Sequence, residues 1–381
     1  MPAAPQKGTP MQGDPVIARH YGPGGREHGG GIGRLIGYVV DEAARRGERH
    51  LVTDTRGERL SPRSALRFAG AMGRMALDRA TAPDRIAHIH MAGRGSTVRK
   101  ILLCGWARTL GCRHVLHLHD YHYAADYEAR PGWQRSLVRA MFAGADAAVV
   151  LGDPDRRLAV QRLQADPHRV VVLHNAVPDP GERPAPPPGP PCILFLGRLS
   201  ERKGVPELLQ ALARPGMASL PWRAVLAGDG PVEDYRRQAE ALGLAGRIEM
   251  PGWLDRPATE ALCRQADILV LPSHAEGMSM AVLEGMAHGL AVVTTPVGSH
   301  PEVLRDGDSG LFVKPGDVQA LAEALDRLLS APELRRALGA RARARFLSDF
   351  SMAAYGRQLD RLYAAIGAER APGSAGEGQR P

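Results

Sequence analysis

Residues 271–287 read LPSHAEGMSMAVLEGMA and carry the clearest structural signal of the chain. An apolar run ends at Leu271, a short polar loop carries Glu276, and small and apolar residues at helical spacing follow Ser279. A strand, a loop and a helix in this order are the repeating unit of a parallel sheet covered by helices. The stretch therefore predicts an α/β fold around it.

The same alternation fills most of the chain in two series. In the first half, strands are predicted at Val16–Arg19, His50–Asp54, Ile86–Met91, His114–His119, Ala147–Leu151 and Val170–Leu173, with helices such as Leu35–Arg46 and Gly95–Leu110 between them. In the second half, strands are predicted at Ile193–Leu196, Ala224–Ala227, Ile248–Met250, Ile268–Leu271, Ala291–Thr294 and Gly310–Val313. We therefore expect two Rossmann-like, doubly wound parallel-sheet domains facing a cleft.

A proline-rich segment divides the two series. Residues 178–191 cannot form a helix or a central strand, because proline lacks an amide donor and fixes φ. The predicted organisation is a disordered N-terminus at 1–14, a first domain at 15–177, a linker at 178–191, a second domain at 192–350, a helix at 351–369 that packs back on the first domain, and a disordered tail at 370–381.

Composition and charge narrow the class of protein. With 381 residues the chain is too long for one ordinary core. It has no apolar run of about 18 residues and no apolar signal-peptide region, so neither a membrane span nor secretion is expected. The four cysteines are scattered and form no C-x-x-C pair, which favours reduced thiols in a cytoplasmic protein.

Positive charge is concentrated in the first half. Residues 1–190 carry 27 Lys and Arg against 18 Asp and Glu, a net of +9, and the remainder carries 22 against 23, a net of −1. A basic half suits the inner surface of the cell membrane or a phosphate-bearing acceptor, and an Arg-rich solvated surface is the alternative. No nucleic-acid motif accompanies the charge, so no nucleic-acid partner is expected.

Two loops after strands of the second half can hold phosphate groups. Residues 196–204 read LGRLSERKG, in which Arg198 can bind a pyrophosphate bidentately and Lys203 as a point charge; a solvated surface loop is the alternative. Residues 227–231 read AGDGP, in which Gly228 and Gly230 permit close approach of a ligand or form a tight turn.

The helix expected after Ser279 offers free amides and a positive dipole end to phosphate oxygens. Glu276 precedes this helix and Glu284 lies one to two turns inside it, so the two carboxylates can hold sugar hydroxyls on both sides of the phosphates. The alternative makes Glu276 a helix-capping acid and Glu284 a solvated helix residue.

Glu276 and Glu284, with seven residues between them, resemble the E-x7-E motif of retaining GT-B glycosyltransferases of family 4, the glycosyl transferases group 1. The neighbouring segments GRLSERKG, AGDGP, PSHAEG, AVVTTPVG, PEV and DGDSGLFV are similar to those of this family and follow in the same order. The resemblance is strong over residues 192–365 and weaker before them.

The resemblance implies that a hexose moves from a UDP- or GDP-sugar to a saccharide or lipid-linked saccharide, with retention, in the synthesis of a bacterial surface polysaccharide. The second domain would bind the donor and the first the acceptor. Glu276 would hold the transferred sugar, Glu284 the ribose, and Arg198 and Lys203 the diphosphate. The amides of Gly277, Met278, Ser279 and Met280 would lie beside the phosphates.

The first half adds three groups of candidates. Gly31 and Gly33 belong to a Gly-rich stretch that matches the family's cleft loop, with a dinucleotide fingerprint as its rival. His119 matches the family's cleft histidine, and a structural histidine is the alternative. Arg94, Arg99 and Lys100 form a basic segment that can hold an acceptor phosphate.

No metal or other cofactor is expected. The cations and the helix end suffice to stabilise a departing diphosphate. His117 and His119 share a strand face that His114 does not, which argues against a three-histidine metal site, and Asp153-Pro154-Asp155 is typical of a helix start.

Other functions on this fold remain open from the sequence. They are a nucleotide-sugar epimerase, a glycan phosphorylase, a non-catalytic nucleotide-sugar-binding subunit and a dehydrogenase. The chain also departs from the family at Met278, where an aromatic residue is common, and at residues 174–176, which read HNA in place of Pro-Asn-Gly.

Overall fold

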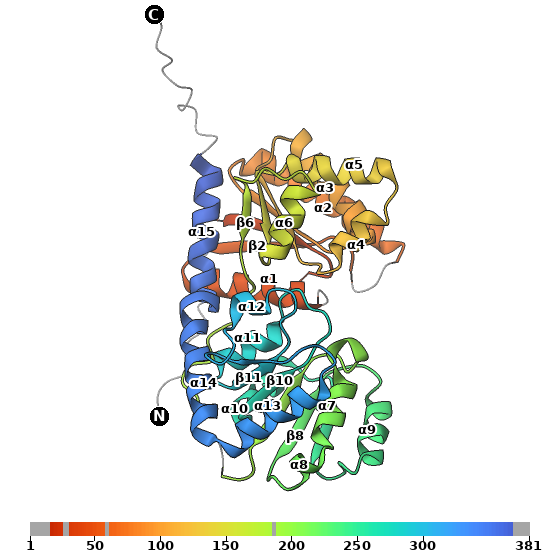
Figure 1. Cartoon of the computed structure of the whole chain (residues 1–381). Helices are drawn as coiled ribbons and strands as arrows, with labels where there is room; N and C mark the ends of the chain where they lie inside the picture. Colours follow the sequence, from red (N-terminus) through yellow and green to blue (C-terminus); the bar gives the residue numbers. More distant parts are fainter. Residues whose placement is uncertain (1–15, 26–29, 58–60, 185–187, 369–381) are drawn as a thin grey trace, which may run out of the picture. The chain divides into compact units, whose positions relative to one another are not determined.

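The computed structural model describes residues 16–25, 30–57, 61–184 and 188–368 (Figure 1). The chain forms two compact units, one drawn from Met1–His174 and Met352–Pro381 and the other from Asn175–Ser351. Each unit holds one six-stranded parallel sheet with helices, which confirms the predicted α/β fold class. The ends predicted to be disordered, 1–14 and 370–381, lie outside the described residues.

The first sheet has the order β2-β1-β3-β4-β5-β6. Its strands are β1 (Val16–Gly22), β2 (Arg49–Asp54), β3 (Ile86–Met91), β4 (His114–Leu118), β5 (Ala147–Val150) and β6 (Val170–Val172). All six strands predicted for the first half are therefore present. The strand order reverses between β1 and β3, which is the topological switch point of this sheet.

The second sheet has the order β12-β11-β10-β7-β8-β9. Its strands are β7 (Cys192–Leu196), β8 (Arg223–Ala227), β9 (Ile248–Gly252), β10 (Ile268–Leu271), β11 (Ala291–Thr294) and β12 (Leu311–Phe312). These also confirm the predicted strands. The switch point lies between β7 and β10, so the loops that follow these two strands lie at the place where doubly wound sheets bind ligands.

Helices accompany both sheets. The first unit contains α1 (Gly30–Arg45), α2 (Arg63–Thr81), α3 (Gly95–Thr109), α4 (Tyr123–Glu128), α5 (Gly132–Ala143), α6 (Asp153–Gln161) and α15 (Met352–Ala368). The second contains η1 (Glu201–Lys203), α7 (Val205–Leu212), α8 (Pro215–Ala218), α9 (Val232–Ala241), α10 (Arg256–Gln265), α11 (Met280–Ala287), α12 (His300–Val303), α13 (Val318–Ser330), α14 (Pro332–Arg345) and η2 (Phe346–Phe350).

The two faces of the first sheet differ in chemistry. Because side chains alternate along a strand, Ile89 and Leu116 face the apolar core with Met75 of α2 and Phe142 of α5. The intervening positions of β3 and β4 carry histidines, yet every residue of both strands is buried. One face of this sheet is thus aliphatic and the other is rich in imidazole.

The last helix belongs to the first unit. Asp360 of α15 accepts a hydrogen bond from Arg46 at 2.5 Å, and the hydroxyl of Tyr363 lies 2.7 Å from Nδ1 of His88. The proline-rich segment, in contrast, belongs to the second unit, because Asp179 pairs with Arg343 at 2.5 Å. This segment is therefore anchored along its described part.

Two further expectations concern membranes and cysteines. No helix in the described ranges is both long and apolar enough to cross a bilayer. The four cysteines are buried and form no disulfide, as their spacing predicts.

Candidate active site

The loops after β7 and β10 bring Lys203 and Glu276 together. The ammonium of Lys203 lies 2.5 Å from Oε1 of Glu276, and the hydroxyl of Ser273 donates to the same oxygen at 2.7 Å. The exposed fractions of the two charged side chains are only 12% and 9%. The Glu276 carboxylate is therefore oriented by two donors, and it takes no part in capping α11, whose N-cap is Ser279.

Arg202 fastens the same two loops to each other, a role that the sequence did not reveal. Its guanidinium donates to the carbonyl of Ala275 at 2.7 Å and lies 3.8 Å from Oε1 of Glu276. The amide of His274 in turn donates to the carbonyl of Arg202 at 2.8 Å. Arg202, Lys203 and Ser273 thus hold Glu276 in place. In the sequence, the only signal for Arg202 and Ser273 is that they lie inside the motifs quoted above.

Arg198 connects the β7 loop to the β8 loop. Its guanidinium lies 3.0 Å from Oδ2 of Asp229, and both side chains are more than half exposed. The amide of Leu199 donates to the carbonyl of Asp229 at 2.7 Å. The structure therefore keeps Arg198 at the solvent side of the loops, free to turn toward an anion.

Gly228 and Gly230 permit this close contact between loops. A Cβ at Gly228 would lie 1.8 Å from the carbonyl oxygen of Gly197, and one at Gly230 would lie 2.4 Å from that of Leu199. Gly230 also has a φ of 120°, which favours glycine. The two glycines therefore allow close packing between the β7 and β8 loops, and close approach of a ligand stays a prediction.

The turn before α11 is packed from two sides. The amide of Ser299 donates to the carbonyl of Gly277 at 2.8 Å. Met278 is buried, and the side-chain amide of Asn175 donates to its carbonyl at 3.3 Å. Met280 opens the helix. These contacts fix the amides at the start of α11, where the sequence predicts a phosphate group.

Glu284 lies half-buried in the second turn of α11. Its helix is short and mostly buried, with Gly285 so close to β10 that a Cβ would lie 2.7 Å from Leu269. The small residues around Glu284 therefore serve the contact between helix and sheet, and Glu284 is the one carboxylate of this helix.

The sequence did not single out His300, a buried residue near the Lys203–Glu276 ion pair. Its Nδ1 lies 3.0 Å from the carbonyl of Thr295, and its Nε2 is buried without a hydrogen-bond partner among the described residues. Burial lowers the pKa of His300, although the Glu276 carboxylate opposes this effect. A neutral imidazole thus lies near Glu276.

In the first unit, His119 lies half-buried just beyond the end of β4. Its backbone amide continues the sheet by donating to Met91 at 2.9 Å, and its Nε2 lies 2.9 Å from Nδ1 of His90. Burial lowers the pKa of His119 to about 3. The ring is therefore neutral near pH 7.

His119 belongs to a cluster of six histidines on one face of the first sheet. The cluster comprises His20, His50, His88, His90, His117 and His119. The parallel register sets His20 beside His88 and His90 beside His117. Burial lowers the pKa of every member of the cluster. The sequence predicted the strands but not the histidine cluster, because the order of the strands in the sheet decides which residues are neighbours across strands.

The other candidates of the first unit lie elsewhere. Gly31 and Gly33 fall in the first turn of α1, not in the loop that the sequence predicts, because the helix begins at Gly30. Residues 26–29, which hold the rest of that stretch, lie outside the described part. Two residues of the predicted basic segment remain accessible to solvent. Arg94, just before α3, is exposed and has a φ of 56°, and Arg99 in α3 is half-buried.

Lys100 does not present a charge to solvent. It is fully buried in α3, and its ammonium donates to the carbonyl of Tyr21 at 3.2 Å and to Thr55 Oγ1 at 3.0 Å. Burial lowers the pKa of Lys100 to about 7. Its helix face turns it toward the sheet, so it is no surface partner of Arg94 and Arg99.

The comparisons with known proteins agree with this geometry. Residues 182–345 match the family of glycosyl transferases group 1. This group 1 match contains Lys203, Glu276 and the other second-unit residues of the candidate site except Asn175.

Relatives of known name support the group 1 match. The chain is 30% identical over 178 residues to the alpha-D-kanosaminyltransferase of Streptomyces kanamyceticus, covering 46% of each protein. It is 33% identical over 185 residues to the lipopolysaccharide core biosynthesis glycosyltransferase LpsE of Rhizobium meliloti (strain 1021), covering 48% of this chain and 51% of LpsE. The chain thus spans about half the length of the curated relatives it matches.

Solved structures establish the fold over nearly the whole chain. The sucrose-phosphate synthase of Thermosynechococcus elongatus gives a TM-score of 0.74 at 19% identity, covering 93% of this chain and all of that one. Anabaena HepE, solved in complex with UDP, gives a TM-score of 0.71 at 17% identity, covering 92% and 100%. The fold is therefore that of the GT-B glycosyltransferases.

Proposed function

We propose that the protein is a retaining glycosyltransferase that moves a hexose from a UDP- or GDP-sugar to a saccharide or lipid-linked saccharide. The observation that carries this proposal is the Lys203–Glu276 pair at the switch point of the second sheet, inside the group 1 match. Ligands of doubly wound folds bind at this point, outside the carboxyl ends of the strands.

The cations of the β7 loop would bind the diphosphate of the donor. Lys203 lies at the end of η1, and Arg198 is solvent-exposed on the same loop. As the sugar–phosphate bond breaks, negative charge develops on the departing nucleoside diphosphate, and fixed cations stabilise it. Removing one such group costs about 3 kcal/mol, on the order of a hundredfold in rate. With these cations and the amides before α11, the proposed reaction needs no divalent metal or other cofactor.

Glu276 would hold the transferred sugar. Its Oε1 accepts from Lys203 and Ser273, and its Oε2 makes no hydrogen bond within the described residues. A sugar hydroxyl can therefore donate to Oε2 while the carboxylate stays oriented. Glu284, one to two turns inside α11, would hold the ribose in the same way.

Retention of configuration would follow from a same-face reaction. No residue of the described site is placed and activated as a nucleophile, so we propose that the acceptor attacks from the face that the diphosphate leaves. The transition state would resemble an oxocarbenium ion, with the diphosphate oxygens beside it. Neutral His119 of the first unit would approach the reacting sugar.

The names of relatives support the choice of substrates. HepE was solved with UDP, and separately with UDP-glucose, which favours a uridine nucleotide as donor. LpsE acts in lipopolysaccharide core biosynthesis, which favours a bacterial surface polysaccharide as product. The basic first half, with exposed Arg94, suits a phosphate-bearing acceptor at the inner face of the cell membrane.

Replacing Glu276 tests the proposal. We expect Glu276→Ala to keep the nucleotide-binding fold and to lower transfer by at least a hundredfold, measured as release of UDP or GDP from a donor panel. Turnover near that of the wild type would contradict the proposal. Binding of a donor without release of the nucleotide would indicate a non-catalytic subunit, and conversion of the donor to its isomer would indicate an epimerase.

A further inference from the structure

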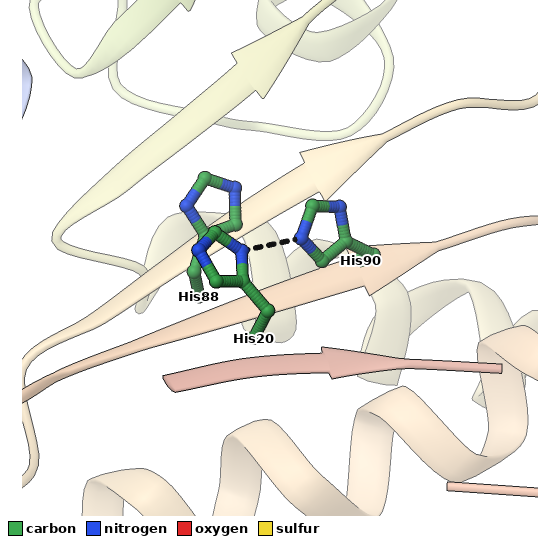
Figure 2. A group of neighbouring side chains, drawn as sticks. All are labelled: His20, His88 and His90. Atoms are coloured by element: carbon green, nitrogen blue, oxygen red, sulfur yellow. Dashed lines mark hydrogen bonds between the residues drawn. The ribbon is translucent and has the colours of Figure 1, made fainter. Parts of the chain in front are cut away.

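The six buried histidines of the first sheet include two groups of three whose ring nitrogens converge. In His20, His88 and His90, and again in His90, His117 and His119, one nitrogen from each ring lies within 4.8 Å of the other two. Figure 2 shows the first group, with the hydrogen bond of 2.9 Å that joins His20 and His90. Buried imidazoles in such an arrangement are typical ligands of transition metals.

The hydrogen bonds decide between the two groups. In the first group every ring nitrogen is occupied: His20 also bonds His50 at 2.8 Å, and His88 bonds Tyr363 and His117. The second group has a nitrogen that is available to bind a metal, because Nε2 of His117 is buried and lacks a hydrogen-bond partner in the described part of the chain. A buried nitrogen left without a partner costs free energy that a metal ion would recover.

We propose that His90, His117 and His119 bind one divalent transition-metal ion of the zinc class. Nδ1 of His90 and Nε2 of His119 already lie 2.9 Å apart. In a tetrahedral zinc site the nitrogens lie about 2.0–2.1 Å from the metal and therefore about 3.3 Å from each other. The two nitrogens therefore need to move apart by less than about 1 Å for the ion to replace the proton that they share.

The remaining nitrogens of two of the three ligands, His90 and His117, have partners that fit this assignment. Nε2 of His90 lies 2.9 Å from Nδ1 of His20, and Nδ1 of His117 lies 3.1 Å from Nε2 of His88. Both can donate their N–H to the next ring, and His88 can then donate to the hydroxyl of Tyr363 at 2.7 Å. Such outer hydrogen bonds orient metal-bound histidines and raise their basicity.

The donor set also selects the class of metal. Three nitrogens and no carboxylate suit zinc, cobalt or nickel, whereas magnesium and calcium require oxygen ligands. The fourth position would be filled by solvent from the side of His119, which is half-buried at the strand end. Asp120 is not an additional ligand, because its two oxygens accept from the amides of Gly93 at 2.7 Å and His122 at 2.9 Å.

This site is distinct from the second-unit residues proposed to bind phosphate, and the proposed transfer reaction does not pass through it. A bound metal ion would, however, prevent His119 from approaching the reacting sugar, which is the role proposed for it above. The binding test is therefore done without substrates, and its result does not depend on whether the protein transfers sugars.

The test is titration of untagged, metal-free protein with Co2+ and Zn2+. We expect one ion per chain, visible bands of tetrahedral cobalt, and displacement of cobalt by zinc. His117→Gln and His90→Gln should each weaken binding at least a hundredfold, whereas His168→Gln, which removes an exposed histidine, should leave it unchanged. Absence of stoichiometric binding to the wild type, or unchanged affinity in His117→Gln, would overturn the proposal.

X-ray absorption of the zinc-loaded wild type provides a second readout that needs no variant. The expected spectrum has three nitrogens at about 2.0–2.1 Å with the outer-shell scattering of imidazole. A first shell of oxygens without imidazole scattering would assign the ion to the surface and contradict the site, even where a histidine variant fails to fold.

Discussion

The ammonium of Lys203 lies 2.5 Å from the carboxylate of Glu276, although 73 residues separate them in the sequence. The parallel sheet makes this contact possible, because β7 and β10 are neighbours and their carboxyl-terminal loops meet. The pair joins the group proposed to hold the sugar to the group proposed to hold the diphosphate. Its removal should therefore affect both stability and activity.

A double-mutant cycle measures the strength of this pair. Because both side chains are nearly buried, removing one partner leaves a charge uncompensated. We expect Lys203→Met and Glu276→Gln each to lower the free energy of unfolding by about 2 kcal/mol, and the double variant to lower it by at least about 1 kcal/mol less than the sum. Urea unfolding gives the values, and strict additivity would show that the two charges do not interact.

Gly228→Ala tests the contact between the β7 and β8 loops. An added methyl group would lie 1.8 Å from the carbonyl of Gly197, so the loop that carries Arg198 must move. We expect a loss of about 2 kcal/mol in stability and weaker nucleotide binding. Gly216→Ala is the matched control, because its Cβ meets nothing within 4 Å, and its stability should stay within about 0.5 kcal/mol of the wild type. Equal effects of the two substitutions would contradict the structure of this loop.

Lys100→Met tests the buried ammonium of α3. Burial lowers the pKa of Lys100 to about 7, so the unfolded chain alone carries the proton between pH 7 and about 10.4, and stability rises with pH in this window. The shift corresponds to about 5 kcal/mol, from which two lost hydrogen bonds of about 1 kcal/mol each must be subtracted.

We therefore expect Lys100→Met to be about 3 kcal/mol more stable than the wild type at pH 6 and nearly equal to it at pH 9. Urea unfolding at the two pH values checks this. Lys314→Met, which removes an exposed lysine, should show no such dependence on pH. A Lys100→Met variant less stable than the wild type at pH 6 would show that the buried charge is better compensated than its two hydrogen bonds indicate.

His50 provides a prediction for acid pH. Burial, assisted by the positive charge of Arg46, lowers the pKa of His50 to about 4 from about 6.5 in the unfolded chain. The unfolded state therefore binds a proton first, so the contribution of His50 is present above pH 6.5 and is lost as the pH falls toward 4.

At pH 5 this loss amounts to about 2 kcal/mol. In the presence of EDTA, His50→Gln should lose less stability between pH 7 and pH 5 than the wild type does, by about this amount. His168→Gln, at an exposed position, should follow the wild type. Parallel curves for His50→Gln and the wild type would show that the ring is protonated in the folded protein.

The sequence was sufficient for the fold, and it singled out Lys203 and Glu276, which the structure brings together. Short apolar runs between helical stretches predicted all twelve strands, because each strand is a short segment that carries its own signal. Motifs on loops predicted Lys203 and Glu276, whose proximity follows from the order of a doubly wound sheet. Arg202 and Ser273 lay inside the same motifs, but the contacts of Arg202 with Ala275 and Glu276 depend on loop geometry that no periodicity encodes.

The first unit shows what the sequence could not predict. The spacing of the histidines in β4 alone predicts no metal site. The ring nitrogens of His90 on β3 and His117 on β4 nevertheless converge with that of His119, because β3 and β4 are adjacent in register. Lys100 looked like a surface cation because its neighbours are charged and polar, yet the rotation of α3 turns it toward Tyr21. Both outcomes depend on the packing of elements and not on local sequence.

The most direct test of the proposed donor site is thermal unfolding of the wild type with UDP, GDP, their sugar derivatives and NAD(H), with and without EDTA. Binding to the folded state raises the melting temperature, and at a given ligand concentration the shift increases with affinity. We predict a shift with UDP or GDP that EDTA does not reduce and that Lys203→Met abolishes. A shift with NAD(H) alone, or no shift with any nucleotide, would contradict the assignment of the second unit to a nucleotide-sugar donor.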